Sequence, residues 1–347
     1  MKCLLTNGHG DLTLSDIEEP KIQPGHLILK TGYASICGTD FSIINGDGPP
    51  WTSYPVVLGH EFSGTIEEIG KDVEDVQVGD EVVVDNYISC HACFYCKKGA
   101  YFYCDHHREP GITFNGGFAE YCLIPYTNVV KIPQGLSLKH AAIAEPTGNC
   151  LRACVTGNIR NGEIILILGC GPISALSGMI CKSMGARVIV LGRGERLKRF
   201  ESMGFELLID TSKESWVDRI GEEYGKYHPQ WGMEAVDVVM DATQTGEMIF
   251  DSIKFLKRRG RLILIGLKKD QVINIPRNDV VLKDIHILGS TSGMGYFHES
   301  LQLIHKGDVD AEEIITHTFT LREGISAYDF FKKRVDGSLK VAVRNDY

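Results

Sequence analysis

Residues 164–174 read IILILGCGPIS, an apolar run that leads directly into a glycine-rich turn. A short, wholly apolar run of this kind is typical of a strand buried on both faces of a parallel sheet. Residues 174–184 then place apolar side chains at helical spacing, and Gly185 follows as a stop signal. Strand, turn and helix in this order predict the start of a βαβ unit.

The same pattern continues on the C-terminal side, where residues 187–191, 236–240 and 261–265 are further strand-like runs separated by amphipathic segments. This alternation predicts an α/β domain with a parallel sheet. Residues 1–150 instead show short extended runs (27–30, 64–69, 81–84 and 118–124) between Gly, Pro, Asn and Asp, which predicts an all-β domain of barrel type. After residue 290 we expect a helix over 297–305, a stop at Gly307 and an extended run over 339–343. The predicted domains are 1–150, 151–290 and a returning segment 291–347.

Composition agrees with a folded protein of two domains, since 347 residues include 43% hydrophobic and 23% charged residues. Acidic residues outnumber basic ones 45 to 36, and no dense Lys/Arg block occurs, so we do not expect a nucleic-acid partner. Apolar runs are too short to span a membrane, and the N-terminus lacks a secretory apolar segment. We therefore expect a cytoplasmic protein that does not enter membranes.

Four of the eleven cysteines, Cys90, Cys93, Cys96 and Cys104, follow the spacing C-x2-C-x2-C-x7-C. Four thiolates at such spacing can surround one tetrahedral Zn²⁺ with no open position, which indicates a structural metal site. An iron–sulfur cluster also accepts four cysteines, and four unrelated thiols in one loop are the remaining interpretation.

The glycine turn after residue 168 has the context that a dinucleotide fingerprint requires, namely a strand before it and a helix after it. Its predicted cofactor-binding residues are Gly169, Gly171, Pro172 and Ile173, and Ser174 occupies the third small position. An ordinary glycine turn between core elements is the alternative.

About twenty residues further on, Gly192-Arg193-Gly194-Glu195-Arg196 lacks the aspartate that would bind the ribose hydroxyls of NAD. Gly192 leaves room for a 2'-phosphate, and Arg193 and Arg196 supply positive charge, so we expect NADP rather than NAD. The alternatives are that Glu195 turns inward or that the arginines are simply solvated.

Two further segments do not indicate a function by themselves. They are Cys37-Gly38-Thr39-Asp40 and Gly59-His60-Glu61-x2-Gly64. Combined with the four cysteines and the glycine turn, they resemble the zinc-dependent medium-chain alcohol and polyol dehydrogenases, most closely the sorbitol and threonine types. The resemblance runs nearly end to end and implies a GroES-like β-barrel catalytic domain and a Rossmann coenzyme domain.

The resemblance also implies roles for individual residues. Cys37, His60 and Glu145 match the ligands of a catalytic zinc, and Glu61 ligates it directly or by exchange with water. Asp40 orients His60, and Thr39 accepts the proton of the substrate. Ser42 stands where many members have a histidine that ends the proton relay, so water, the cofactor ribose or another residue completes the route here. Further cofactor contacts are implied at Thr243, Gly266 and Leu267.

The expected activity is therefore hydride transfer between a secondary alcohol, such as a polyol, sugar derivative or amino alcohol, and NAD(P). The expected cofactors are two Zn²⁺ ions per subunit, one catalytic and one structural, and the family implies a homodimer or homotetramer. Two other functions compete with this hypothesis. One is a catalytically silent zinc and dinucleotide-binding scaffold, and the other is a zinc-free quinone or enoyl reductase, which conflicts with both metal motifs.

Overall fold

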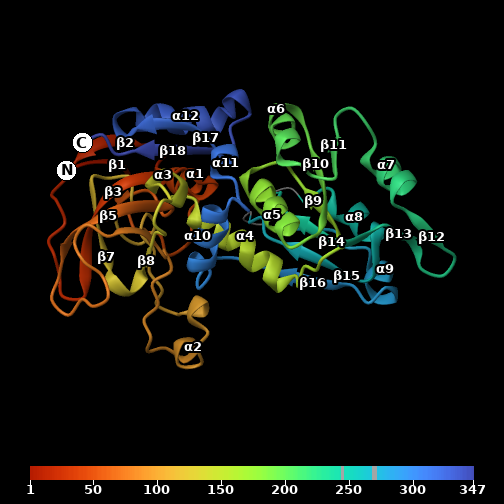
Figure 1. Cartoon of the computed structure of the whole chain (residues 1–347), viewed down its shortest axis with the longest axis horizontal. Helices are drawn as coiled ribbons and strands as arrows, with labels where there is room; N and C mark the ends of the chain where they lie inside the picture. The colour runs from red at the N-terminus through yellow and green to blue at the C-terminus, as the bar shows by residue number, and fades with distance from the viewer. Residues whose placement is uncertain (244–245, 268–271) are drawn as a thin grey trace. The chain divides into compact units, whose positions relative to one another are not determined.

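A computed structural model describes residues 1–243, 246–267 and 272–347 (Figure 1). These residues form two compact units. The first comprises Met1–Gly148, Ser292–Gly307 and Ile315–Tyr347, and the second comprises Asn149–Thr291 and Asp308–Ile314. The chain thus leaves and re-enters the first unit.

The first unit is built mainly from antiparallel strands. Its larger sheet has the order β17-β18-β3-β5-β6-β8, with β7 also paired to β3, and its smaller sheet has the order β2-β1-β4. The strands are β1 (Lys2–Thr6), β2 (Thr13–Asp16), β3 (His26–Ser35), β4 (Val56–Val57), β5 (Phe62–Ile69), β6 (Glu81–Val84), β7 (Tyr121–Pro125), β8 (Val129–Lys131), β17 (Ile315–Thr320) and β18 (Lys340–Arg344). The helices of this unit are α1 (Gly38–Ile44), α2 (Phe94–Lys97), α3 (Leu138–Ala141), α10 (Phe297–Lys306) and α12 (Gly324–Lys333).

Strand β3 organises this unit because it pairs with three other strands, β5, β7 and β18. Its apolar side chains join a core that includes Leu27, Leu29, Phe62 and Val341. The sequence predicted a strand over 118–124, but β7 begins only at Tyr121. The reason is that Phe118 bonds outside a regular ladder: its N–H donates to Leu58 and its carbonyl accepts from Leu4.

The second unit is an α/β sandwich around a six-stranded sheet of order β11-β10-β9-β14-β15-β16, in which every pairing is parallel. This order is that of a dinucleotide-binding Rossmann sheet. Its strands are β9 (Ile164–Leu168), β10 (Arg187–Gly192), β11 (Leu207–Asp210), β14 (Val236–Asp241), β15 (Leu256–Leu264) and β16 (His286–Gly289), with a hairpin of β12 (Lys226–His228) and β13 (Gly232–Glu234). The helices are α5 (Pro172–Ser183), α6 (Gly194–Lys198), α7 (Trp216–Glu223), α8 (Ile249–Phe255), α9 (Arg277–Leu282) and α11 (Ala311–Ile314), while α4 (Ala144–Thr156) runs through the boundary of the two units.

The central strands of this sheet end together at one edge. Leu168 is in register with Leu191 and with Asp241, and Asp241 is in register with Leu264. The carboxyl edge of a parallel sheet is where ligands bind in folds of this class. The sequence prediction of a two-domain α/β protein with a GroES-like and a Rossmann part is confirmed.

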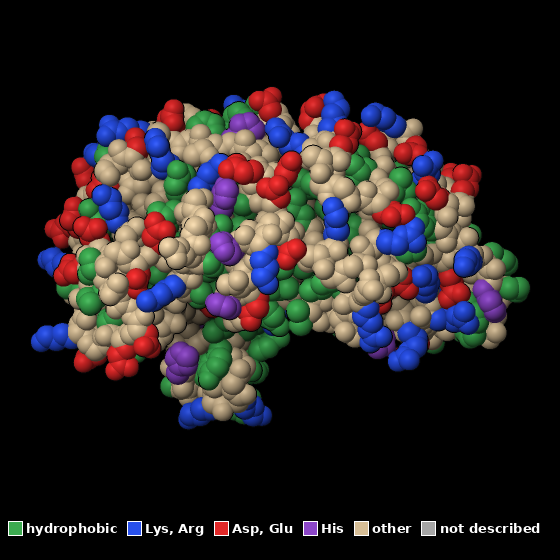
Figure 2. All heavy atoms as spheres, in the orientation of Figure 1, with side chains coloured by type: hydrophobic (Ala, Val, Ile, Leu, Met, Phe, Trp, Pro, Cys, Tyr) green, Lys and Arg blue, Asp and Glu red, His purple; other side chains and the backbone are tan. Residues whose placement is uncertain are grey.

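On the face of the protein shown in Figure 2, basic and acidic side chains are interspersed over the surface. None of the helices that the structure describes is both long enough and apolar enough to cross a lipid bilayer.

Candidate metal and dinucleotide sites

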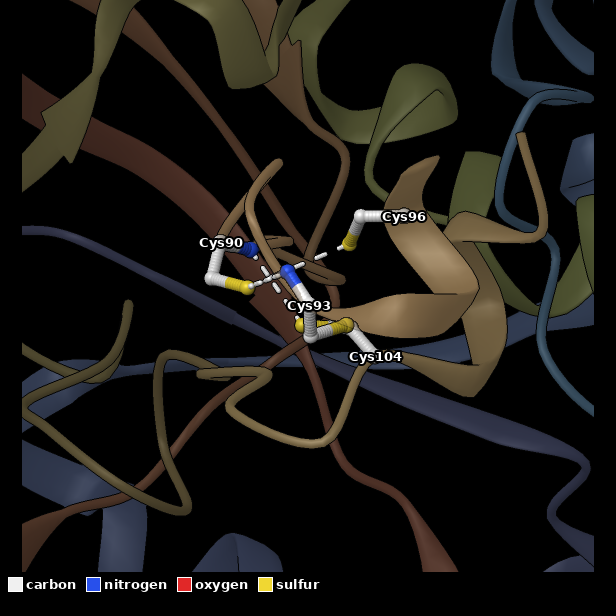
Figure 3. A group of neighbouring side chains, drawn as sticks. All are labelled: Cys90, Cys93, Cys96 and Cys104. Atoms are coloured by element: carbon white, nitrogen blue, oxygen red, sulfur yellow. Dashed lines mark hydrogen bonds between the residues drawn. The ribbon is translucent and has the colours of Figure 1, made fainter. Parts of the chain in front are cut away.

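The first candidate metal site is formed by four cysteines around the short helix α2. Cys90 precedes the helix, Cys93 is its N-cap, Cys96 lies within it, and Cys104 follows the 3-10 turn Tyr101–Tyr103. Their four sulfur atoms lie within 4.8 Å of one another and point toward a common centre (Figure 3). The Sγ atoms of Cys90 and Cys96 are 4.0 Å apart, close to the ~3.8 Å between ligands of a tetrahedral zinc–thiolate site.

Backbone amides around these cysteines donate hydrogen bonds that stabilise the thiolate form of the side chains. Cys90 Sγ accepts N–H bonds from Ala92 and Cys93, and Cys104 Sγ accepts them from Cys90 and His106. The two amide donors lower the pKa of Cys90 to about 6. A closed set of four sulfurs with amide donors fits a structural Zn²⁺ bound to deprotonated thiols.

The second candidate metal site joins Cys37, His60 and Glu61, whose ligand atoms also lie within 4.8 Å of one another. Cys37 is the N-cap of α1, and His60 and Glu61 immediately precede β5. Gly59, which precedes His60, has a φ of +98°, and a Cβ there would lie 2.8 Å from the backbone nitrogen of Phe118. A glycine at this position therefore lets the chain before His60 pass close to Phe118. His60 and Glu61 are buried and Cys37 is half-buried, and their sulfur, nitrogen and oxygen donors fit a catalytic zinc, so the residues present match the metal that the sequence implies.

Asp40 supports two of these three residues. Its Oδ2 accepts the N–H of Cys37 at 2.9 Å, and its Oδ1 lies 3.5 Å from His60 Nδ1. Burial alone would lower the pKa of His60, but the nearby Cys37 and Asp40 groups raise it well above its ordinary value. The negative potential that favours a protonated imidazole is the same potential that attracts a metal cation.

Thr39 and Ser42 lie in α1, the helix that begins directly after Cys37. Thr39 Oγ1 is 3.6 Å from Cys37 Sγ, so its hydroxyl is beside the metal group. Ser42 is half-buried, and its carbonyl accepts an N–H bond from Asp47.

Glu145 is buried in the first turn of α4 but is outside the group of ligand atoms that lie within 4.8 Å. Its Oε1 accepts a bond from Asn86 Nδ2 at 3.4 Å. Its charge contributes to raising the pKa of Lys340, which also contacts Glu61, so Glu145 lies near the metal group.

Asn86 and Lys340 are two residues of this neighbourhood that sequence reasoning missed. Lys340 Nζ contacts both carboxylate oxygens of Glu61, although 279 residues separate them. The only signal in the sequence was a charged residue inside the apolar run 339–343.

The glycine turn of the second unit has the geometry of a phosphate cradle. Gly169 has a φ of +99°, and Gly171 is the extended N-cap of α5 with Pro172 and Ile173 as the first helical residues. No side chain caps this N-terminus, and a Cβ on Gly171 would meet no atom within 4 Å. A helix N-terminus that has no side-chain cap and faces open space at Gly171 fits a pyrophosphate.

Thr243 and Gly266 are brought to the same edge of the sheet. A Cβ on Gly169 would lie 3.0 Å from Thr243 Cγ2, and a Cβ on Gly266 would lie 1.8 Å from the carbonyl oxygen of Thr243. Leu267 follows with 73% of its surface exposed.

The candidate 2'-phosphate residues follow β10. Gly192 is the last residue of the strand, and a Cβ there would lie 2.6 Å from the side chain of Cys170 in the glycine turn. Arg193 is exposed and is the N-cap of α6, while Arg196 is half-buried. Glu195 pairs with Lys198 at 2.6 Å, so its carboxylate is engaged on the helix surface.

Known proteins resemble the chain over almost its whole length. Residues 23–134 match the family model of the alcohol dehydrogenase GroES-like domain, and residues 172–306 match that of the zinc-binding dehydrogenases. A D-arabitol-phosphate dehydrogenase of Enterococcus avium is 30% identical, over 98% of this chain and 95% of its own. A sorbitol dehydrogenase of Halalkalibacterium halodurans is 30% identical, over 96% of each chain.

Solved structures agree with these relatives. An alcohol dehydrogenase from Escherichia coli CFT073, complexed with NADH, superposes with a TM-score of 0.90 at 26% identity, over 99% of each chain. A protein from Sinorhizobium meliloti 1021, described as a zinc-binding dehydrogenase and bound to NADP, has a TM-score of 0.90 at 29% identity, over 99% of this chain and 98% of its own. The chain therefore belongs to the zinc-dependent medium-chain dehydrogenase/reductase family and is an oxidoreductase that acts on alcohols.

Proposed function

We propose that this enzyme interconverts a secondary alcohol and its ketone by hydride transfer to and from NAD(P), and that its substrates are polyols, sugar-derived alcohols or amino alcohols. The observation that carries the proposal is the group of Cys37, His60 and Glu61 with converging ligand atoms, supported by Asp40. Relatives named as arabitol-phosphate, sorbitol and threonine dehydrogenases support this range of substrates.

In the proposed mechanism Cys37, His60 and Glu145 would hold the catalytic zinc, with Glu61 as the nearby carboxylate that can exchange with water. When bound, zinc lowers the pKa of a hydroxyl so that an alkoxide can form at neutral pH. Asp40 fixes the ring of His60, and Thr39 Oγ1 accepts the proton that the substrate hydroxyl loses. Ser42 follows Thr39 in α1 and can pass a hydrogen bond onward, while a water or the cofactor ribose carries the proton out because serine does not store it at neutral pH.

A second zinc is proposed at the cysteines of the α2 segment, which gives two ions per subunit. The closed set of four sulfurs and the amide bonds to Cys90 and Cys104 support a structural role. Membership of a zinc-dependent dehydrogenase family favours zinc over an iron–sulfur cluster at this site.

NADP is the proposed preferred cofactor. Arg193 is exposed at the end of β10, and the carboxylate of Glu195 is engaged by Lys198. A cationic side chain without a competing acid favours a 2'-phosphate over free ribose hydroxyls. The related structures hold NADP in one case and NADH in the other, so the preference rests on these residues.

The proposed assembly is a homodimer or homotetramer, and the proposed location is the cytoplasm. Strand β16 is at one end of the parallel sheet, and Ile287 in it is 37% exposed, so this edge is available for pairing with a second copy. None of the eleven cysteines, all of which lie among the described residues, is in a disulfide, which agrees with a reducing compartment.

The test is oxidation of a secondary alcohol that carries deuterium at the reacting carbon. Sorbitol, an arabitol phosphate and threonine are offered with NADP and NAD, and the reduced cofactor is analysed for deuterium. Deuterium in the nicotinamide ring, and its loss in His60→Ala with cofactor binding retained, would support the proposal. No transfer from any of the three substrates, while both cofactors bind, would favour the silent scaffold.

A further inference from the structure

Lys340 is a buried lysine that contacts one residue of the candidate catalytic metal site, Glu61. Its side chain is 3% exposed, and Nζ lies 2.5 Å from both carboxylate oxygens of Glu61, which is itself 1% exposed. The third hydrogen of the ammonium group is directed to the carbonyl of Ile36, 3.1 Å away. All three donors of Lys340 are therefore satisfied by residues of the metal-site neighbourhood.

Glu61 is correspondingly enclosed by donors. Lys340 contacts both of its oxygens, and Ser35 Oγ donates to Oε2. Cys37 is also close enough to Lys340 to help raise the pKa of the ammonium group. A metal ion at Cys37 and His60 thus has to compete with an ammonium group for the lone pairs of Glu61.

A buried ion pair of this kind contributes little net stability, because both charges lose their hydration. Ala342, the next residue on the same face of β18, is apolar and fully buried. Folding alone therefore does not account for a lysine at this position, whereas control of a carboxylate beside the metal does.

We propose that Lys340 is a positioning residue that holds the Glu61 carboxylate off the catalytic metal, so that the metal keeps an open position for the substrate oxygen. This inference rests on the proposed function, since it assumes a metal at Cys37 and His60. The inference is that Lys340 restrains the Glu61 carboxylate. The sequence motifs around Cys37 and His60 do not reveal this restraint.

The test removes the ammonium group in Lys340→Met and follows zinc release from the catalytic site to a chelator. Freed of its partner, Glu61 would bind the metal, so zinc release is expected to slow at least tenfold. With cobalt at this site and zinc left at the four cysteines, the visible spectrum is expected to change as a carboxylate replaces water. Lys340→Arg, which keeps a cation, should retain the parental spectrum.

Two further variants keep the test informative if Lys340→Met does not fold. The double variant Lys340→Met/Glu61→Gln removes both charges and should show the parental cobalt spectrum, because the proposal has Glu61 off the metal. Lys283→Met is the matched control: Lys283 is another buried lysine, bonded to three backbone carbonyls in the second unit, and its loss should leave the cobalt spectrum unchanged.

An unchanged spectrum and unchanged or faster zinc release in Lys340→Met would overturn the inference, as would an altered spectrum in the double variant. A parental protein that binds no metal at Cys37 and His60 would instead be a failure of the proposed function. The two failures are therefore distinguishable.

Discussion

The exposed guanidinium of Arg193 is the residue on which the proposed preference for NADP depends most strongly. NADPH and NADH differ only in the 2'-phosphate, so replacing Arg193 by alanine should weaken binding of one cofactor and spare the other. A hydrogen bond to a charged group contributes about 1.5–3 kcal/mol. At 1.4 kcal/mol per factor of ten, the loss corresponds to about 10- to 150-fold in Kd.

Exposure of Arg193 places the expected loss near the lower limit, because solvent and salt screen charges at a surface. We therefore expect Arg193→Ala to weaken NADPH about tenfold and NADH less than about twofold. Fluorescence titration of the reduced nicotinamide measures both constants, and raising the salt concentration should reduce the difference between parent and variant.

A matched control is Arg219→Ala, which removes an exposed arginine from α7 of the same unit, where it pairs with Glu223. This variant should bind both cofactors like the parent. Equal weakening of NADPH and NADH by Arg193→Ala, or a parental protein that binds NADH more tightly than NADPH, would refute the reasoning.

Three other predictions concern zinc content, folding stability and catalysis. Cys93→Ser should remove one zinc per chain by elemental analysis and lower Tm by roughly 5 °C or more, whereas Cys170→Ser should do neither; an unchanged zinc content in Cys93→Ser would exclude the structural site. Burial raises the pKa of Asp85 to about 6 from its ordinary value of 3.8, so the folded state favours the protonated acid and loses stability as the pH rises between these values. Asp85→Asn should accordingly gain about 2–3 kcal/mol by chemical denaturation at pH 8 and progressively less toward pH 5; a gain independent of pH would contradict this. Glu145→Gln should leave cofactor Kd unchanged and lower kcat for alcohol oxidation about tenfold or more, as expected for a carboxylate near the reacting group, and an unchanged kcat would remove Glu145 from the site.

Local sequence signals predicted those parts of the fold that depend on short-range chemistry. The apolar run 164–168 is β9, and the glycine turn leads into α5 as expected, because strand propensity, Gly169 and Pro172 act within a few residues. The spacing of Cys90, Cys93, Cys96 and Cys104 was also enough to predict that their side chains form one group. Short strands with mixed polarity, such as β11 and β17, gave no comparable signal.

The neighbourhood of the metal site was less predictable because long-range packing builds it. Lys340 reaches Glu61 only after β18 pairs with β3, and Asn86 reaches Glu145 across 59 residues. Neither contact follows from a motif, since each depends on the register of strands that are distant in sequence. Cofactor preference likewise depends on where Arg193 and Glu195 point after β10 ends.

The measurement that tests the central claim most directly is the zinc content of parent and Cys37→Ser, combined with alcohol oxidation by the same samples. We predict two zinc ions per chain in the parent, and one in the variant, which should still bind NADPH but transfer no hydride. A Cys37→Ser protein that keeps two zinc ions and the parental rate would contradict the assignment of Cys37 and His60 as the catalytic metal site.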